Sequence, residues 1–173
     1  MAVALYFLPN AAERCIYDRS AILHGQVWRL WTGNLVHFGA SHLWWNLAVL
    51  VPAGVWAERV VPRAARWLYA VGPLVIGLSL LAFYPALGRY AGLSGLGAGL
   101  LALLAFTFLA RPGRDHAFWR AVLVLLTAKI VAELLSGHAL LAHFSEPGLR
   151  TVPLAHLAGV ATAVVLHVVR RRI

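Results

Sequence analysis

Five long apolar stretches, separated by short clusters of arginine, proline and glycine, constrain what this chain can fold into. A helix needs about 20 apolar residues to cross the hydrocarbon core of a bilayer. By that length, membrane-spanning helices are predicted at roughly residues 38–57, 64–84, 92–110, 118–137 and 152–169. The loops between them are short, so residues 1–173 are predicted to form one all-α membrane domain.

The composition excludes a water-soluble globule. Apolar residues make up 61% of the chain and charged residues 12%, with a mean hydropathy of +0.77, whereas soluble domains are roughly 45–50% apolar. The net charge of +9 in so apolar a chain is typical of loop charge that orients helices, and not of nucleic-acid binding. The single cysteine, Cys15, allows no internal disulfide and no cysteine metal site.

The first eight residues form a shorter apolar run that stops at Pro9. It is too short for a spanning helix, and it does not fit a signal peptide. We expect residues 1–8 to be the end of a sixth helix whose beginning is missing, and the alternative is a form with five full spans.

The arginines predict the orientation, because basic residues concentrate in cytoplasmic loops. Nine follow the first, third and fifth spans: Arg59, Arg63, Arg66, Arg111, Arg114, Arg120, Arg170, Arg171 and Arg172. Five lie on the other side, partly balanced by Glu13, Asp18 and Glu146: Arg14, Arg19, Arg29, Arg89 and Arg150. The C-terminus is therefore predicted to be cytoplasmic.

Polar residues inside spans are costly and mark candidate functional sites. His42 and Asn46 share a helical face near the outer start of the first span, Ser94 begins the third, and His156 lies near the outer end of the last. Each alone fits a structural role, such as a backbone-bonded serine or an interhelical hydrogen bond. The predicted topology places all of them at similar depth on the non-cytoplasmic side, which favours a common site.

These residue types can perform acyl transfer. A histidine near neutral pH can take the proton of a serine hydroxyl and later protonate the leaving amine, so Ser94 and His156 are the predicted nucleophile and base. The negative oxygen of the intermediate needs fixed donors. We expect His42, Asn46 and the backbone of Gly92-Leu93-Ser94 to stabilise it, with the helix dipole at Ser94 assisting.

Small residues should let the two catalytic helices approach closely. Gly95 and Gly99 form one pair at the required spacing, and Gly159 and Ala163 form another just after His156.

Two other groups of polar and aromatic residues are assigned supporting roles. Lys129 and Glu133 lie four apart and are predicted to pair, as a structural pair or, alternatively, for substrate recognition. Aromatic residues near the outer boundary resemble an interfacial belt: Trp28, Trp31, Trp44, Trp45 and His37. The remaining histidines, His24, His138 and His143 in outer loops and His167 near the terminal arginines, are predicted to face solvent or lipid headgroups.

The chain resembles the rhomboid intramembrane serine proteases. The residues that carry the resemblance are Gly25-Gln26-Val27-Trp28-Arg29-Leu30-Trp31-Thr32, His37, His42-x-x-x-Asn46, Glu58, Gly92-Leu93-Ser94-Gly95 and His156-Leu157-Ala158-Gly159. The resemblance implies a six-helix bundle with a water-filled cavity open to the outer side. It makes Ser94 the nucleophile, His156 the base, and His42 with Asn46 the oxyanion site. Trp28, Arg29 and Glu58 become structural residues. No metal or other cofactor is implied.

Within this family the short chain and the Val152-Pro153-Leu154-Ala155-His156 stretch look most like the rhombosortase branch. That likeness implies a bacterial inner-membrane enzyme whose substrates are single-span proteins with a C-terminal Gly-Gly, helix and basic tail. One departure is Ala98, since many rhomboids have there a tyrosine that stacks on the base. His156 must therefore be oriented by another group.

Three alternatives remain open from the sequence. An inactive rhomboid-like protein could bind or escort membrane helices. A haem protein could use paired histidines as ligands. A small transporter subunit would need a charged path, for which only Lys129 and Glu133 are available.

Overall fold

The computed structural model describes residues 1–113, 115–137 and 151–172, and these residues are mostly helical. Five residues used above for orientation or loop exposure lie outside the described residues: Arg114, His138, His143, Glu146 and Arg150.

Five long helices occupy the five predicted apolar stretches. They are α5 (Ala40–Val60), α6 (Pro62–Phe83), α7 (Ser94–Leu109), α8 (His116–Ser136) and α9 (Pro153–Arg172). Local sequence sets several of their ends: proline opens α6 and α9, where its missing N–H is tolerated, and Gly137 ends α8 at a φ of +68°. The prediction of helices in these stretches is confirmed.

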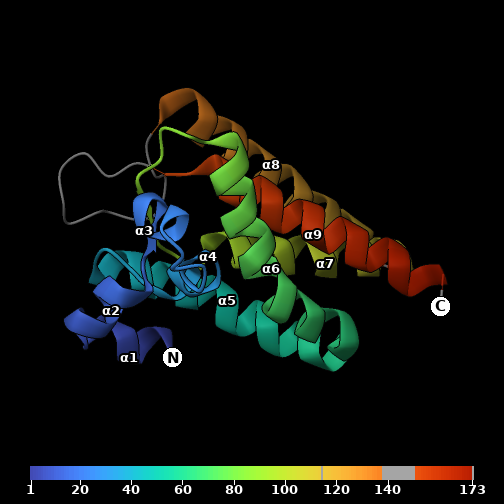
Figure 1. Ribbon diagram of the computed structural model, residues 1–173. Helices are drawn as coiled ribbons and strands as arrows, with labels where there is room; N and C mark the ends of the chain where they lie inside the picture. Colours follow the sequence, from blue (N-terminus) through green and yellow to red (C-terminus); the bar gives the residue numbers. More distant parts are fainter. Residues whose placement is uncertain (114, 138–150, 173) are drawn as a thin grey trace.

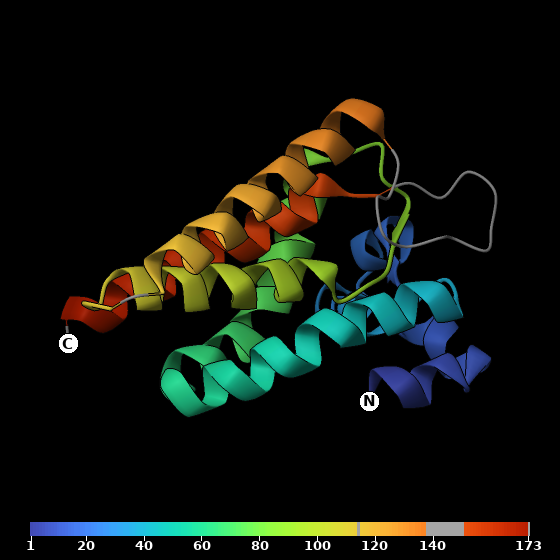
Figure 2. The same cartoon turned by 180° about the vertical axis from the view of Figure 1, so that it is seen from behind.

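Helix α7 is the centre of the bundle. It contacts each of the other four long helices, and it lies between α5 and the α8–α9 pair (Figure 2). Its side chains Leu100, Leu103 and Leu104 are almost completely buried. A glycine-rich and alanine-rich sequence allows the neighbouring backbones to approach this helix closely.

Helices α5, α7 and α9 begin on the same side of the molecule. In both views each starts near the short N-terminal helices and runs toward the side where α9 and the C-terminus end (Figures 1 and 2). The first turns of these three helices hold His42, Ser94 and His156. The three residues therefore lie at the same end of the bundle, whereas their depth in a membrane and the side that they face stay predictions.

The N-terminal part of the chain forms short elements at that end. They are α1 (Ala2–Tyr6), α2 (Pro9–Cys15), β1 (Tyr17–Asp18), α3 (Arg19–Leu23), α4 (Arg29–Thr32) and the 3₁₀ helix η1 (Gly33–Leu35). Strand β1 pairs antiparallel with β2 (Arg89–Tyr90), which leads into α7. The helix expected over residues 1–8 thus ends at Tyr6, and a separate helix starts at Pro9.

Among the described residues, two helices are long and apolar enough to cross a membrane by themselves, namely α6 and the Pro153–Arg170 part of α9. Helix α7 is apolar but shorter, and α8 carries Arg120, Lys129 and Glu133 within its length. Five spans are therefore not confirmed and stay a prediction. Outward apolar side chains on α8, such as Leu125 and Leu135, are well exposed and suit contact with lipid.

Two histidines are buried, although His37 was predicted to belong to the interfacial belt and His167 to face lipid headgroups. His37 is only 8% exposed and packs on His42, with ring centroids 5.0 Å apart. His167 is also 8% exposed and its ring lies 6.0 Å from that of Phe106 on α7. Both predictions were wrong because these side chains face neighbouring helices, whereas Trp44 and Trp45 of the predicted aromatic belt are indeed exposed.

Candidate active site

Ser94 is the first residue of α7 and is partly buried. The chain enters the helix through Gly92, whose φ of +125° favours glycine. The buried hydroxyl of Tyr90 donates to the Gly92 carbonyl oxygen at 3.0 Å. Burial raises the pKa of Tyr90, so the neutral phenol holds the turn that presents Ser94.

His42 and Asn46 of α5 pack against this turn. A Cβ atom placed on Gly92 would lie 2.6 Å from Nε2 of His42 and 3.6 Å from Nδ2 of Asn46. Both side chains are buried, and the Nδ2 of Asn46 has no hydrogen-bond partner within the described part of the chain. A buried amide donor of this kind is available to a negative oxygen formed beside Gly92.

His156 reaches the same region through a close crossing of α7 and α9. A Cβ atom on Gly95 would lie 2.7 Å from the carbonyl oxygen of Ala155, and one on Gly99 would lie 2.8 Å from that of Gly159. A Cβ atom on Gly159 would collide with the carbonyl oxygen of Gly95. Ser94 and His156 are the chain neighbours of this contact. The close approach predicted for Gly95, Gly99 and Gly159 is therefore observed.

Glu133 of α8 contacts His156 of α9. Its Oε2 lies 3.2 Å from Nδ1 of His156, while its Oε1 accepts a 2.7 Å hydrogen bond from Nζ of Lys129. Glu133 is 2% exposed, and the Lys129 side chain 28%. The predicted Lys129–Glu133 pair is thus present. The contact with His156 was missed, although Ala98 indicated that some other group must orient the base.

His37 supports His42 from the loop between η1 and α5. Its burial, and secondly the proximity of His42, lower the pKa of His37 from 6.5 to about 3, opposed in part by a backbone hydrogen bond at Leu35. His37 is therefore neutral at physiological pH. Its edge-to-face contact with His42 limits the positions that the His42 ring can take.

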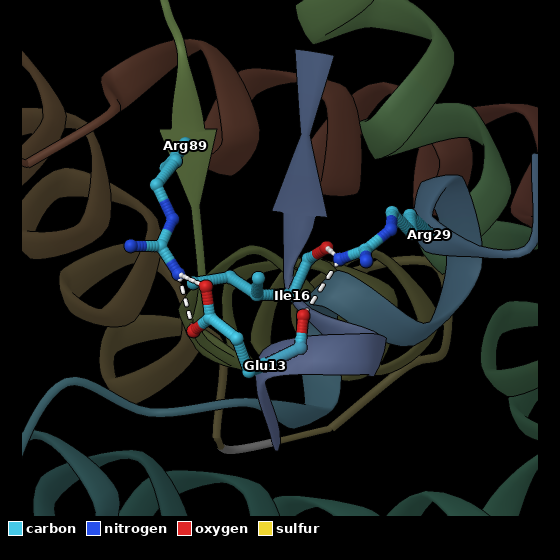
Figure 3. Close-up of polar contacts among 4 residues, drawn as sticks. All are labelled: Glu13, Ile16, Arg29 and Arg89. Carbon is cyan, nitrogen blue, oxygen red and sulfur yellow. Dashed lines mark hydrogen bonds and ion pairs between the residues drawn. The ribbon is translucent and has the colours of Figure 1, made fainter. Parts of the chain in front are cut away.

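The predicted structural motif Trp28-Arg29 ties the N-terminal segment to the bundle. Figure 3 shows Arg29 donating to the backbone carbonyl oxygens of Glu13 and Ile16, both at 2.8 Å. Arg89, one residue before Tyr90, binds the carboxylate of Glu13 at 2.6 Å. We call this group, Glu13, Ile16, Arg29 and Arg89, the N-terminal clamp, and it anchors the strand that leads to Ser94.

Some predicted residues lie apart from this cluster. Glu58 is near the opposite end of α5 from His42 and pairs with the exposed Arg66 at 3.2 Å. Trp28 is half exposed and donates to the carbonyl oxygen of Arg14 at 3.1 Å. Leu93 is buried as the residue before α7. Within the described ranges, no group of three or more His, Cys, Asp or Glu side chains is placed to hold a metal ion.

The site therefore combines a hydroxyl at a helix N-terminus, a buried imidazole with a carboxylate oxygen 3.2 Å from its Nδ1, and buried donors around a glycine turn. A weak nucleophile next to a general base, with donors for a developing oxyanion, suits acyl transfer. The candidate donors come from α5, the candidate nucleophile from α7, and the candidate base and the carboxylate beside it from α9 and α8.

Comparison with known families agrees with this geometry. The rhomboid domain family matches residues 24–173, from the loop before α4 to the end of α9. No curated protein matches the chain. Rhomboid proteins are integral membrane proteins and serine peptidases that cleave within the membrane. Because the match covers far more than half of its length, this chain belongs to the rhomboid family.

Proposed function

We propose that this protein is an active intramembrane serine endopeptidase with Ser94 as nucleophile and His156 as general base. The observation that carries the proposal is the pair of close contacts on either side of Ser94. Gly92 packs on His42 and Asn46, and Gly95 packs on Ala155, next to His156. The residues on the two sides of Ser94 thus contact the helices that carry the candidate oxyanion donors and the candidate base.

The first chemical step is acylation. Nε2 of His156 takes the Ser94 proton as Oγ attacks the scissile carbonyl carbon, and the carbonyl electrons move onto its oxygen. Collapse of this intermediate breaks the C–N bond. The same proton then passes from His156 to the leaving amine, so that an ester on Ser94 and a neutral base remain.

The developing oxyanion is stabilised by His42, Asn46 and backbone N–H groups at residues 92–94. Removing one such donor typically costs on the order of a hundred- to a thousandfold in rate. We therefore expect His42→Ala and Asn46→Ala each to lower activity by on the order of a hundred- to a thousandfold.

The ester is resolved by water activated through His156, which regenerates the serine. Another acceptor amine in place of water would make the same site a transferase, because both react with the acyl-enzyme.

Helix lengths support a site below the membrane surface. The 16 residues of α7 extend about 24 Å at about 1.5 Å per residue, less than the roughly 30 Å of a hydrocarbon core. A helix of this length that reaches the cytoplasmic face leaves Ser94 within the outer leaflet. We propose a multi-pass protein with five full spans, its active site toward the non-cytoplasmic side and its C-terminus in the cytoplasm, as the arginine distribution indicates.

The proposed substrates are single-span membrane proteins with a C-terminal Gly-Gly, helix and basic tail in a bacterial inner membrane. The resemblance of the chain to the rhombosortase branch supports this finer assignment. Two adjacent glycines also suit a site lined by the bulky His42 and His156, because glycine lets a backbone approach closely.

The test is co-expression with a single-span reporter carrying such a tail. Matched controls are a reporter with Leu-Leu in place of Gly-Gly and the enzyme variant Ser94→Ala. We expect cleavage only of the Gly-Gly reporter and only by unsubstituted enzyme. Cleavage of both reporters would overturn the tail specificity but not the protease. Capture of the reporter without cleavage would favour the alternative of an inactive helix binder.

A further inference from the structure

We propose that Glu133 is a positioning residue for His156, so that the site works as a serine–histidine–glutamate triad. This inference rests on the proposed protease function. It assigns to Glu133 a role in the reaction in place of a purely structural pair with Lys129, or of substrate recognition.

The geometry places the Glu133 carboxylate on the side of His156 away from its Nε2. Oε2 of Glu133 and Nδ1 of His156 are 3.2 Å apart, and both side chains are at most 5% exposed. The two atoms are not aligned as a hydrogen bond, and neither has another hydrogen-bond partner in the part of the chain that the structure describes. Catalytic hydrogen bonds are often misaligned without substrate and tighten when it binds.

Lys129 reduces the free-energy cost of burying the Glu133 carboxylate in an apolar bundle. An isolated carboxylate buried there would be neutralised by a proton, and it would lose the negative charge that stabilises a protonated His156. Lys129 occupies Oε1 at 2.7 Å and leaves Oε2 for the imidazole. The spacing of four residues on α8 directs both side chains to the same face.

A carboxylate at Nδ1 performs two tasks that the reaction needs. It holds the proton of neutral His156 on Nδ1, so that the Nε2 lone pair is free to accept the Ser94 proton. When Nε2 becomes protonated, the negative charge stabilises the imidazolium. Ala98 offers no ring to stack on His156, so the carboxylate supplies the orientation that a stacking tyrosine would otherwise give.

The experiment compares Glu133→Gln, Glu133→Asp and the double variant Glu133→Gln/Lys129→Met with unsubstituted enzyme. Asp115→Asn is the matched control, because it removes an exposed carboxylate just before the same helix. Reporter cleavage gives kcat and KM, a fluorophosphonate probe gives the rate of Ser94 modification without substrate, and thermal unfolding checks the fold.

We expect Glu133→Gln to lower kcat by on the order of a hundred- to ten-thousandfold, with KM changed less than threefold. Glu133→Asp should recover part of the loss, and the control should match the unsubstituted enzyme. The double variant separates the two roles, since it removes both charges and leaves no unpaired buried cation. A merely structural pair predicts recovered activity in the double variant, whereas positioning of His156 predicts that it stays as slow as Glu133→Gln.

A measurement independent of turnover uses ¹⁵N-labelled histidine and NMR, with His156→Gln to assign the signal. We expect the neutral His156 to carry its proton on Nδ1 in unsubstituted protein, and to lose this preference in Glu133→Gln. Equal kcat in Glu133→Gln and unsubstituted enzyme, or an unchanged tautomer, would overturn the role of Glu133. An enzyme that neither cleaves nor labels at Ser94 would instead overturn the proposed function, while the tautomer still tests the Glu133–His156 contact.

Discussion

Both the backbone conformation and the close packing at Gly92 favour glycine, and the two effects can be tested separately. Its φ of +125° is strained for any other residue, and a Cβ atom would lie 2.6 Å from His42. Gly25 has a similar φ of +100° but open space around its Cβ position. Backbone strain of this kind costs about 1–3 kcal/mol. Both Gly92→Ala and Gly25→Ala should therefore reduce thermal stability.

Only Gly92→Ala should also lose activity, by about a hundredfold or more, because it displaces a candidate oxyanion donor. Reporter cleavage by the folded fraction of each variant measures this difference. Equal activities of the two alanine variants would contradict the placement of His42 at the glycine turn.

Because His37 is buried and neutral, we expect the free energy of unfolding to decrease as the pH falls. Its pKa is about 3 in the folded state and 6.5 in the unfolded chain. Between these values the unfolded chain binds the proton and the folded protein does not, so the free energy of unfolding rises with pH. The contribution of this group is complete above about pH 6.5 and is lost at up to about 1.4 kcal/mol per pH unit as pH falls toward 3.

The measurement is thermal unfolding in detergent at several pH values, for unsubstituted protein and His37→Gln. The variant should show the shallower dependence, because a glutamine does not titrate. Parallel curves would show that His37 is not a buried neutral group.

Among the elements, the crossing of α7 and α9 determines whether Ser94 and His156 meet. Gly159→Ala adds a Cβ atom that collides with the Gly95 carbonyl, so the helices must separate. Gly97→Ala adds one on another face of α7, where the nearest neighbour is a side-chain atom of Val49 at 3.4 Å. We expect Gly159→Ala to lower reporter cleavage at least tenfold and Gly97→Ala less than threefold. The reverse order would contradict the crossing.

Two sets of polar contacts in the N-terminal clamp are expected to differ in their contribution to stability. Arg29 donates to two backbone oxygens and to the side chain of Gln26 at 2.7 Å, whereas the Glu13–Arg89 pair is exposed. Exposed ion pairs contribute about 0–1 kcal/mol, and hydrogen bonds from a charged group about 1.5–3 kcal/mol. Arg29→Lys should therefore destabilise by about 2 kcal/mol and Glu13→Gln by less than about 1 kcal/mol in denaturant unfolding. A larger effect of Glu13→Gln would exclude this division of roles.

The helices could be predicted from sequence more completely than their contacts. Apolar length located all five long helices, and the spacing of Lys129 and Glu133 predicted their pair. Pairing of β1 with β2 joins segments about 70 residues apart, and two-residue strands leave no periodic pattern to detect. The two buried histidines, His37 and His167, were assigned from their sequence neighbours, which do not determine burial.

For the whole molecule, the direction of the helices was the most informative prediction about the site. The predicted alternation of the spans placed the starts of the first, third and fifth spans on one side, so the sequence could place His42, Ser94 and His156 at one end without any contact being known. Helices α5, α7 and α9 do start on the same side (Figures 1 and 2). The role of Glu133 could not be predicted in this way. Helical spacing defines a face of α8, but only the packing of α8 determines which neighbour that face meets.

The central claim is that Ser94 is an activated nucleophile in this membrane-embedded bundle. Its most direct measurement is mass spectrometry of the purified protein after reaction with a fluorophosphonate probe. We predict a single adduct on Ser94, formed at least a hundredfold more slowly in His156→Ala and absent in Ser94→Ala. A folded protein that stays unlabelled, or a Ser94→Ala variant labelled as fast as the unsubstituted protein, would contradict the claim.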